Sequence, residues 1–280
     1  MIDEIAAQRV AVNAPRSGWS RPNLGELWAF RDLLVLLVRR DVAVRYKQSF
    51  AGVLWVVLQP AMLATVYSVF LGVLAKVPSG NGVPYPVLVV SGMVLWLAFS
   101  TSLTRSALST TASAELISKV YFPRLIIPLA AAIPALLDFA IGVLVVLVTM
   151  LIFGVQPHWA IVLLPLLAPL LLLLAGGAGT YFAALNVRYR DVQLVVPFLL
   201  QVGLFVTPVV YPLSLVPDNL QWLYGLNPMV GLLELYRWML FPDSPWPGWL
   251  VAVPLVLGPL LAIAGVLYYE KVQRAFADVI

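Results

Sequence analysis

The sequence predicts an all-α integral membrane protein. We expect six transmembrane helices, an N-terminal amphipathic interface helix, and short re-entrant or interfacial helices before the last span. Hydrophobic residues make up 62% of the 280 residues and charged residues only 11%, and the mean hydropathy is +0.96. A soluble domain carries about 25% charged residues. The apolar residues form long continuous runs, whereas a membrane barrel needs alternating segments of about ten residues.

Six apolar stretches are long enough to cross the hydrocarbon core of a bilayer, which takes about 20 residues of helix. They cover residues 50–75, 86–110, 125–153, 159–184, 192–212 and 248–269. In hydrocarbon every backbone N–H and C=O group needs an internal partner, so we expect each stretch to be helical. Residues 49–280 are therefore predicted to form one six-span transmembrane domain.

The segment before the first span is basic. Residues 1–23 are predicted to be a disordered cytoplasmic extension, without the apolar core of a cleavable signal peptide. Residues 24–48 are predicted to form an amphipathic helix on the inner membrane surface; the alternative is a solvated juxtamembrane segment. Its apolar face carries Leu27, Phe30, Leu34, Leu37 and Val38. Its basic side chains are Arg39, Arg40, Arg45 and Lys47.

Lysines and arginines are distributed unequally between the two sides of the predicted spans. With the N-terminus inside, 15 of the 17 fall on the cytoplasmic side, and only Lys76 and Arg237 fall on the other. Cytoplasmic loops are enriched in Lys and Arg, so we expect both termini to be cytoplasmic. The same rule places residues 105–124 and 188–191 in cytoplasmic loops.

Two of the cytoplasmic segments have further features. In 113–124, "SAELISKVYFPR", Ser113 is predicted to cap a short helix that Pro123 terminates. The aromatic end of this helix could fill a groove on another protein. In 188–191, "RYRD", Arg188 and Arg190 are either topology anchors alone or part of a functional contact.

The region 213–247, before the last span, is predicted to form an outer gate. Asn227 is expected to cap a helix that begins with Pro228. The two apolar pieces have about 8–14 residues, or about 12–21 Å of helix, which is too short to cross a bilayer. Glu234 and Arg237 share a helix face, either as a surface pair or as a polar latch beside the exit. The gate residues are Tyr211, Asn227, Glu234 and Arg237.

Several kinds of chemistry are missing from the sequence. There is no cysteine, and His158 is the single histidine, so no metal site is expected. No G-x-x-x-x-G-K-[ST] loop occurs, so this chain is not expected to hydrolyse ATP. Asp138 lies deep in a predicted span, where it either packs helices together by hydrogen bonding or belongs to a polar lining. The shortage of such ionisable groups argues against an ion-coupled carrier.

Four stretches together resemble the export permeases of the ABC-2 type. "NVRYRDV" followed by "VPFLLQVGLFVTPVVYP" is similar to the family's fourth cytoplasmic loop and fifth span. "AGVLWVVLQPAMLATVYSVFLGVL" resembles its first span, and "ELISKVYFPRLIIP" its coupling helix. "LNPMVGLLELYRWMLF" resembles the region before its last span. The likeness covers about residues 25 to 275 and is closest to polysaccharide exporters.

The resemblance implies a homodimer in the bacterial cytoplasmic (inner) membrane. It also implies two copies of a separate ATPase subunit, which would bind ATP and Mg, so that this chain needs no cofactor and is not an enzyme. Membrane lipid is an expected partner, and nucleic acid is not. Residues that would couple to the ATPase are Glu115, Leu116, Ser118, Lys119, Tyr121, Phe122, Arg124, Arg188, Tyr189, Arg190 and Asp191.

The function implied is export of a polyprenyl-diphosphate-linked polysaccharide, with O-antigen, teichoic acid and cell-wall galactan all open. The alternative is an ABC-2 permease for a small amphipathic drug or lipid. A long polymer needs a path that binds it weakly, and aromatic faces suit this, although each one could instead face lipid or pack between helices. The candidate channel-lining residues are Trp55, Tyr67, Phe70, Trp96, Phe99, Phe198 and Phe205.

Overall fold

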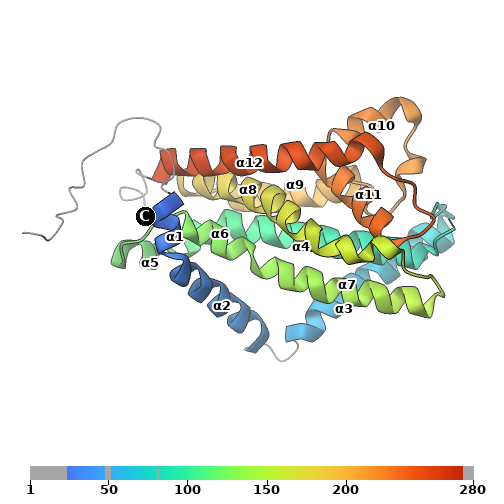
Figure 1. Ribbon diagram of the computed structural model, residues 1–280, viewed down its shortest axis with the longest axis horizontal. Coiled ribbons are helices and arrows are strands. Elements are labelled where there is room, and N and C mark those ends of the chain that lie inside the picture. The colour runs from blue at the N-terminus through green and yellow to red at the C-terminus, as the bar shows by residue number, and fades with distance from the viewer. Residues whose placement is uncertain (1–23, 48–51, 81, 274–280) are drawn as a thin grey trace, which may run out of the picture.

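The computed structural model describes residues 24–47, 52–80 and 82–273, and within them every regular element is a helix. This confirms the all-helical membrane fold. The long helices run side by side along the long axis of the molecule (Figure 1). The predicted extension 1–23 lies outside the described residues.

Among the residues that the structure describes, five helical stretches are long and apolar enough to cross a membrane. The first joins α3 (Gly52–Tyr67) to the π-helix η2 (Ser68–Leu74), and the second is α4 (Tyr85–Ala112). The third joins α6 (Ile126–Ala132) to α7 (Pro134–Ile152). The fourth joins η3 (Trp159–Leu166) to α8 (Leu167–Arg188), and the fifth joins η5 (Gly248–Val251) to α12 (Ala252–Val272).

The predicted fifth span, 192–212, is shorter than expected. Its helix, α9 (Val192–Val206), has 15 residues and ends at Thr207, which is extended with φ −92° and ψ 133°. Thr207 precedes Pro208, and a residue before proline is disfavoured in the helical region. The helix is about 22 Å long, so α9 alone does not cover a bilayer core of about 30 Å.

α4 lies at the centre of the bundle and packs against α6, α7 and α8. Small residues allow the helices to approach closely, as is usual where lipid gives no hydrophobic drive for association. A Cβ on Gly92 of α4 would lie 2.2 Å from the carbonyl oxygen of Val209. A Cβ on Gly265 of α12 would lie 2.2 Å from that of Gly177 in α8. The bundle therefore depends on these glycines having no side chain.

The predicted interface segment forms two helices, α1 (Leu24–Ala29) and α2 (Arg31–Lys47). All five residues of the predicted apolar face pack on one cluster with Ile126 and Ala130 of α6. α2 then runs obliquely away from the bundle toward the start of α3 (Figure 1). The apolar face of α1 and α2 is thus used partly against protein.

The short helices lie at the two ends of the molecule (Figure 1). α5 (Ala114–Lys119) lies beside α1 at one end, which we call the α5 end. η4 (Leu213–Leu215), α10 (Asp218–Gly225) and α11 (Pro228–Leu240) belong to the opposite end, the α10 end. The two polar segments singled out from the sequence are therefore separated by the length of the bundle.

Candidate functional site

α5 and the turn after it present polar side chains at the α5 end. Glu115 and Lys119 form an exposed ion pair of 3.4 Å, and Ser118 between them is exposed. Tyr121 is 81% exposed, and its hydroxyl lies 3.4 Å from Glu26 of α1. The helix is shorter than the predicted 113–124, and Ser113 precedes it without a side-chain cap.

Two of the predicted coupling residues face the protein instead. Phe122 is only 5% exposed, and Leu116 packs on the cluster formed with Leu37 and Ile126. These side chains hold the segment against the bundle. A partner protein can therefore reach Glu115, Ser118, Lys119 and Tyr121, but not Phe122.

Arg124 fastens the segment to the ends of two long helices. Its Nη1 donates to the carbonyl oxygen of Gln273 at 2.6 Å, just after α12. Its own carbonyl oxygen accepts from the hydroxyl of Tyr269 at 3.2 Å. The Tyr269 hydroxyl also lies 3.1 Å from that of Thr110 in α4, and both residues are fully buried. Displacement of the α5 segment would therefore strain its hydrogen bonds to α12 and, through Tyr269, to α4.

The 188–191 turn joins α8 to α9 and is fully accessible. Arg188, Tyr189, Arg190 and Asp191 are all exposed, and the Arg188 guanidinium carbon lies 5.3 Å from the Tyr189 ring centroid. Just before the turn, the buried Asn186 donates to the hydroxyl of Thr111 at 2.9 Å. The end of α8 thus contacts α4 at Thr111, which lies three positions before the start of α5.

The basic residues of α2 have different environments. Arg39 is exposed, and Arg40 forms an exposed pair with Asp41 at 2.9 Å. Arg45 instead reaches Asp138 of α7, with 2.5 Å between Nη1 and Oδ2. The side chain of Lys47 lies outside the described residues.

Asp138 connects α2 to the inside of a span. It is 9% exposed and accepts a hydrogen bond from the Tyr46 hydroxyl in addition to the Arg45 ion pair. Burial raises the pKa of Tyr46, and the hydrogen bond to Asp138 raises it further, so the phenol keeps its proton as donor. This geometry favours the helix-packing role for Asp138.

Arg105 was assigned to a cytoplasmic loop from the sequence, but it lies inside α4, seven residues before the end of that helix. It faces a cavity of about 930 Å³ between α2, α4, α5 and α6. One arginine near the end of the apolar run 86–110 changes its mean hydropathy little, so hydropathy did not show whether Arg105 lies in the helix or after it. The sequence after Arg105, with Ser106, Ser109 and Thr110, gives no signal that the helix continues, because Ser and Thr are weak helix formers.

The predicted channel aromatics divide into two groups. Trp55 of α3, Phe70 of η2, and Phe198 and Phe205 of α9 are more than half exposed. Tyr67, Trp96 and Phe99 are buried or partly buried in the core. The rings of Trp96 and Phe99 lie 5.6 Å apart and line a second cavity of about 220 Å³ against α9. Only the first group lies on the outer surface of the bundle, where a substrate, lipid or second subunit can contact it in this conformation.

At the α10 end, Asn227 accepts from the backbone N–H of Met229 at 3.0 Å, which confirms the predicted helix cap. Its amide also donates to the Thr207 hydroxyl at 3.0 Å. The cap therefore holds the start of α11 against the end of α9. Tyr211, the other gate residue near this joint, donates its hydroxyl proton to the carbonyl oxygen of Phe205 at 2.6 Å.

Glu234 and Arg237 form the expected ion pair, with 3.0 Å between Oε1 and Nη1. The Arg237 side chain is only 4% exposed, however, and points into the protein. It donates to the carbonyl oxygens of Val209 at 3.0 Å and Tyr211 at 3.4 Å. Tyr85 donates to the next carbonyl, that of Val210, at 2.5 Å. Arg237 thus supplies hydrogen-bond donors to two carbonyl oxygens of the non-helical segment after α9.

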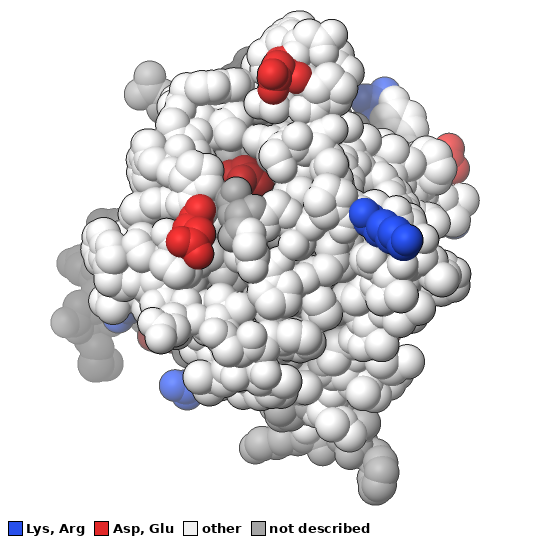
Figure 2. Space-filling model, turned by 90° about the vertical axis from the view of Figure 1, so that its right-hand side faces the viewer, with Lys and Arg blue, Asp and Glu red and all other residues white. Residues whose placement is uncertain are grey.

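The surface of the α10 end is nearly uncharged. Figure 2 looks onto this end and shows a few isolated acidic and basic side chains on an otherwise uncharged face. Trp159, Trp238 and Trp246 form edge-on contacts with centroid separations of 6.2 Å and 4.8 Å. Such a face can contact lipid headgroups or neutral sugars through aromatic rings.

Curated relatives of this chain are permeases of polysaccharide exporters. An "O-antigen export system permease protein RfbA" from Myxococcus xanthus is 33% identical over 259 residues, covering 90% of this chain and 97% of the relative. A protein of the same name from Klebsiella pneumoniae is 29% identical, covering 92% and 97%. A "Polysialic acid transport protein KpsM" from Escherichia coli is 28% identical, covering 74% and 80%.

The family model described as "ABC-2 type transporter" matches residues 32–241. This range starts in α2, includes α5 and the 188–191 turn, and ends after α11. It therefore contains both polar segments of the α5 end and the non-helical backbone of the α10 end. The chain belongs to the ABC-2 type transporter family.

Proposed function

We propose that this chain is the membrane subunit of an ATP-driven exporter that moves a polyprenyl-diphosphate-linked polysaccharide across the bacterial cytoplasmic membrane. The observation that carries the proposal is the likeness over 90% of the chain to an O-antigen export permease. The alternative, a small amphipathic drug or lipid, has no comparable support among the relatives.

The proposed assembly is a homodimer of this chain with two copies of an ATPase subunit that binds ATP and Mg. α5 is the proposed contact with the ATPase because its polar side chains are exposed while Arg124 ties the segment to α12. Movement of α5 would be transmitted to α12 and α4 through the hydrogen bonds of Arg124 and Tyr269. The α5 end then faces the cytoplasm, which agrees with the enrichment of Lys and Arg in cytoplasmic segments.

The proposed path of the polymer runs along the exposed aromatics of α3, η2 and α9 toward the α10 end. Weak stacking on aromatic faces allows a sugar chain to slide. At the α10 end the polymer would meet a surface that carries only a few isolated charges (Figure 2).

Depletion of the protein tests the proposal. We expect a polyprenyl-linked glycan to accumulate in the cytoplasmic leaflet, and its composition identifies the sugar. Unchanged glycan lipids, together with accumulation of a small amphipathic compound, would instead support the alternative.

A further inference from the structure

The cavity at the α5 end is large and mixed in character. Its volume of about 930 Å³ lies within the range of about 300–1,000 Å³ that is usual for small-molecule sites. Apolar side chains such as Leu37, Val44 and Leu108 line part of it. The small residues Ala130 and Ala131 of α6 leave the space open. A ligand with both an apolar and a polar part fits this lining.

The charges around the cavity do not balance. Arg40 is paired with Asp41 on α2, and Arg45 is paired with Asp138 on α7. Arg105 makes no hydrogen bond or ion pair within residues 24–47, 52–80 and 82–273. Its charge still interacts at longer range with Asp41 and Asp138, both already paired. Glu115, which also lines the cavity, is paired with Lys119. Each of these carboxylates thus has its own cation, and the charge of Arg105 is left over.

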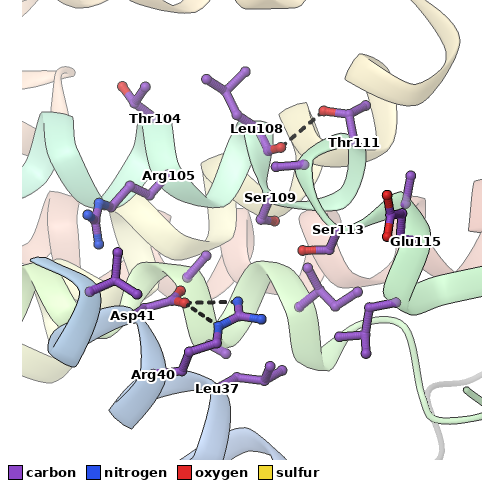
Figure 3. A pocket seen from close by; sticks show the side chains of 17 residues that line it. Leu37, Arg40, Asp41, Thr104, Arg105, Leu108, Ser109, Thr111, Ser113 and Glu115 are labelled. Atoms are coloured by element: carbon purple, nitrogen blue, oxygen red, sulfur yellow. Dashed lines mark hydrogen bonds and ion pairs between the residues drawn. The ribbon is translucent and has the colours of Figure 1, made fainter. Parts of the chain in front are cut away.

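The position of Arg105 makes this imbalance costly. It lies within the α4 span and is only partly exposed. A cation in a partly dehydrated site gains most from an anion that it can contact directly. Figure 3 shows its side chain reaching from α4 toward α2, with the Arg40–Asp41 pair on the facing wall. The guanidinium group therefore points into the space that a ligand would occupy.

Two hydroxyl groups add hydrogen-bond donors. Thr104 and Ser113 line the same cavity and have no side-chain hydrogen bond within the part of the chain that the structure describes. Ser109 and Thr111, by contrast, already donate to backbone carbonyls of α4. A planar guanidinium without a partner of its own is a favourable group for phosphate oxygens.

We propose that this cavity binds the diphosphate group of the lipid-linked substrate, with Arg105 as its principal contact. The proposal rests on the proposed export function. α2 forms one wall of the cavity and runs obliquely away from the bundle, so the isoprenoid chain can remain in lipid beside Val44 and Leu108 while the sugar extends past α5. The cavity is then the place where substrate enters the transporter.

Binding to the complete transporter, permease with its ATPase in nanodiscs of zwitterionic lipid, tests the proposal. The probe is a short-chain polyprenyl diphosphate. We expect Arg105→Gln to weaken its affinity about tenfold, as for loss of one charge-assisted contact, and Arg105→Lys to weaken it less. Arg31→Gln, an exposed arginine of α2 outside the cavity, is the matched control and should bind within about twofold of the wild type. Thr104→Val, which retains the arginine, provides a second variant if Arg105→Gln fails to fold.

Competitors distinguish the source of the phosphate. Inorganic diphosphate should compete weakly and in an Arg105-dependent way, and polyprenol without phosphate should not compete. Competition by phosphatidylglycerol as strong as that of polyprenyl diphosphate would show a general anionic-lipid site and overturn the proposal. Inorganic diphosphate binding as tightly as the lipid would overturn it too, in favour of a soluble phosphate compound.

The inference and the proposed function fail in different ways. If depletion accumulates a lipid-linked glycan but Arg105→Gln and Thr104→Val both bind the probe normally, export stands and the cavity assignment is wrong. If the wild-type transporter does not bind the probe and depletion accumulates no such glycan, the proposed function itself is wrong.

Discussion

Arg45 of α2 and Asp138 of α7 form an ion pair of 2.5 Å that joins the helix before the first span to the inside of the bundle. The Tyr46 hydroxyl donates to the same carboxylate, so two consecutive residues of α2 hold one acidic group. Asp138 is 9% exposed and the Arg45 side chain 24%. The contact is therefore shielded from water, and its loss leaves a charge without its partner.

Asp138→Asn should destabilise the protein, because Arg45 keeps its charge in a largely dehydrated place. We expect a loss at the lower end of the about 3–5 kcal/mol typical for a broken buried pair. Thermal unfolding of the detergent-purified protein measures it. Asp41→Asn, which breaks the exposed Arg40 pair, is the control and should cost less than about 1 kcal/mol. Equal melting temperatures for the two variants would contradict this account.

Glu115→Lys and Tyr121→Ala should uncouple ATP hydrolysis from export without impairing folding. Both side chains are exposed, so their loss removes contacts to a partner and none from the core. A hot-spot contact is worth about 1–3 kcal/mol, which corresponds to roughly a fivefold to 150-fold weaker association. The measurements are transport and permease-stimulated ATPase activity in vesicles.

Phe122→Ala is the matched contrast in the same segment. Its ring is buried, so truncation should cost about 3–5 kcal/mol of stability. Wild-type coupling in both exposed variants would refute the ATPase contact at α5.

Replacing Arg188 and Arg190 by Ala should abolish export and leave the membrane orientation unchanged. Both side chains are exposed in the turn between α8 and α9, so little folding energy depends on them. Thirteen of the Lys and Arg residues on the same side remain to set the topology. Accessibility of single introduced cysteines reports orientation. An inverted topology would show that these residues serve only as anchors.

Arg237→Ala should impair export and stability more than Glu234→Ala. Arg237 serves two backbone carbonyls as well as Glu234, and each buried acceptor left without a donor costs about 1–3 kcal/mol. The exchange Glu234→Arg with Arg237→Glu should not restore function, because a glutamate cannot donate to Val209 and Tyr211. Export assays and limited proteolysis of the 207–212 segment measure this. Recovery in the exchanged variant would show that the two residues serve only each other.

The sequence reveals those parts of the fold that depend on hydrophobic length and local chemistry. Continuous apolar runs predict the long helices, and Asn227 followed by Pro228 predicts the start of α11. The end of α9 could also have been predicted, because Pro208 disfavours helix at Thr207. The apolar run continues past this point, and its length concealed the break.

Contacts between distant segments could not be read from the sequence. Arg237 pairs with the residue three positions earlier as expected, but its burial depends on where α9 ends. Arg45 and Asp138 are 93 positions apart, and no local pattern joins them. Arg105 was assigned wrongly for a different reason. A single charge near the end of an apolar run does not indicate whether the residue belongs to the helix or to the loop after it.

α3 and η2 have a consequence for the lipid environment of the protein. Together they form a 21-residue apolar span. Only 11% of the residues in its most apolar part are buried, whereas the corresponding fraction for α4 is 72%. Within one subunit this helix has few buried contacts with its neighbours, so its position depends largely on what surrounds its exposed face. Its tilt should therefore follow the thickness of the surrounding membrane, since mismatch costs only fractions of a kcal/mol per ångström. The rest of the bundle would keep its packing, so membrane composition is expected to adjust the angle between α3 and α4.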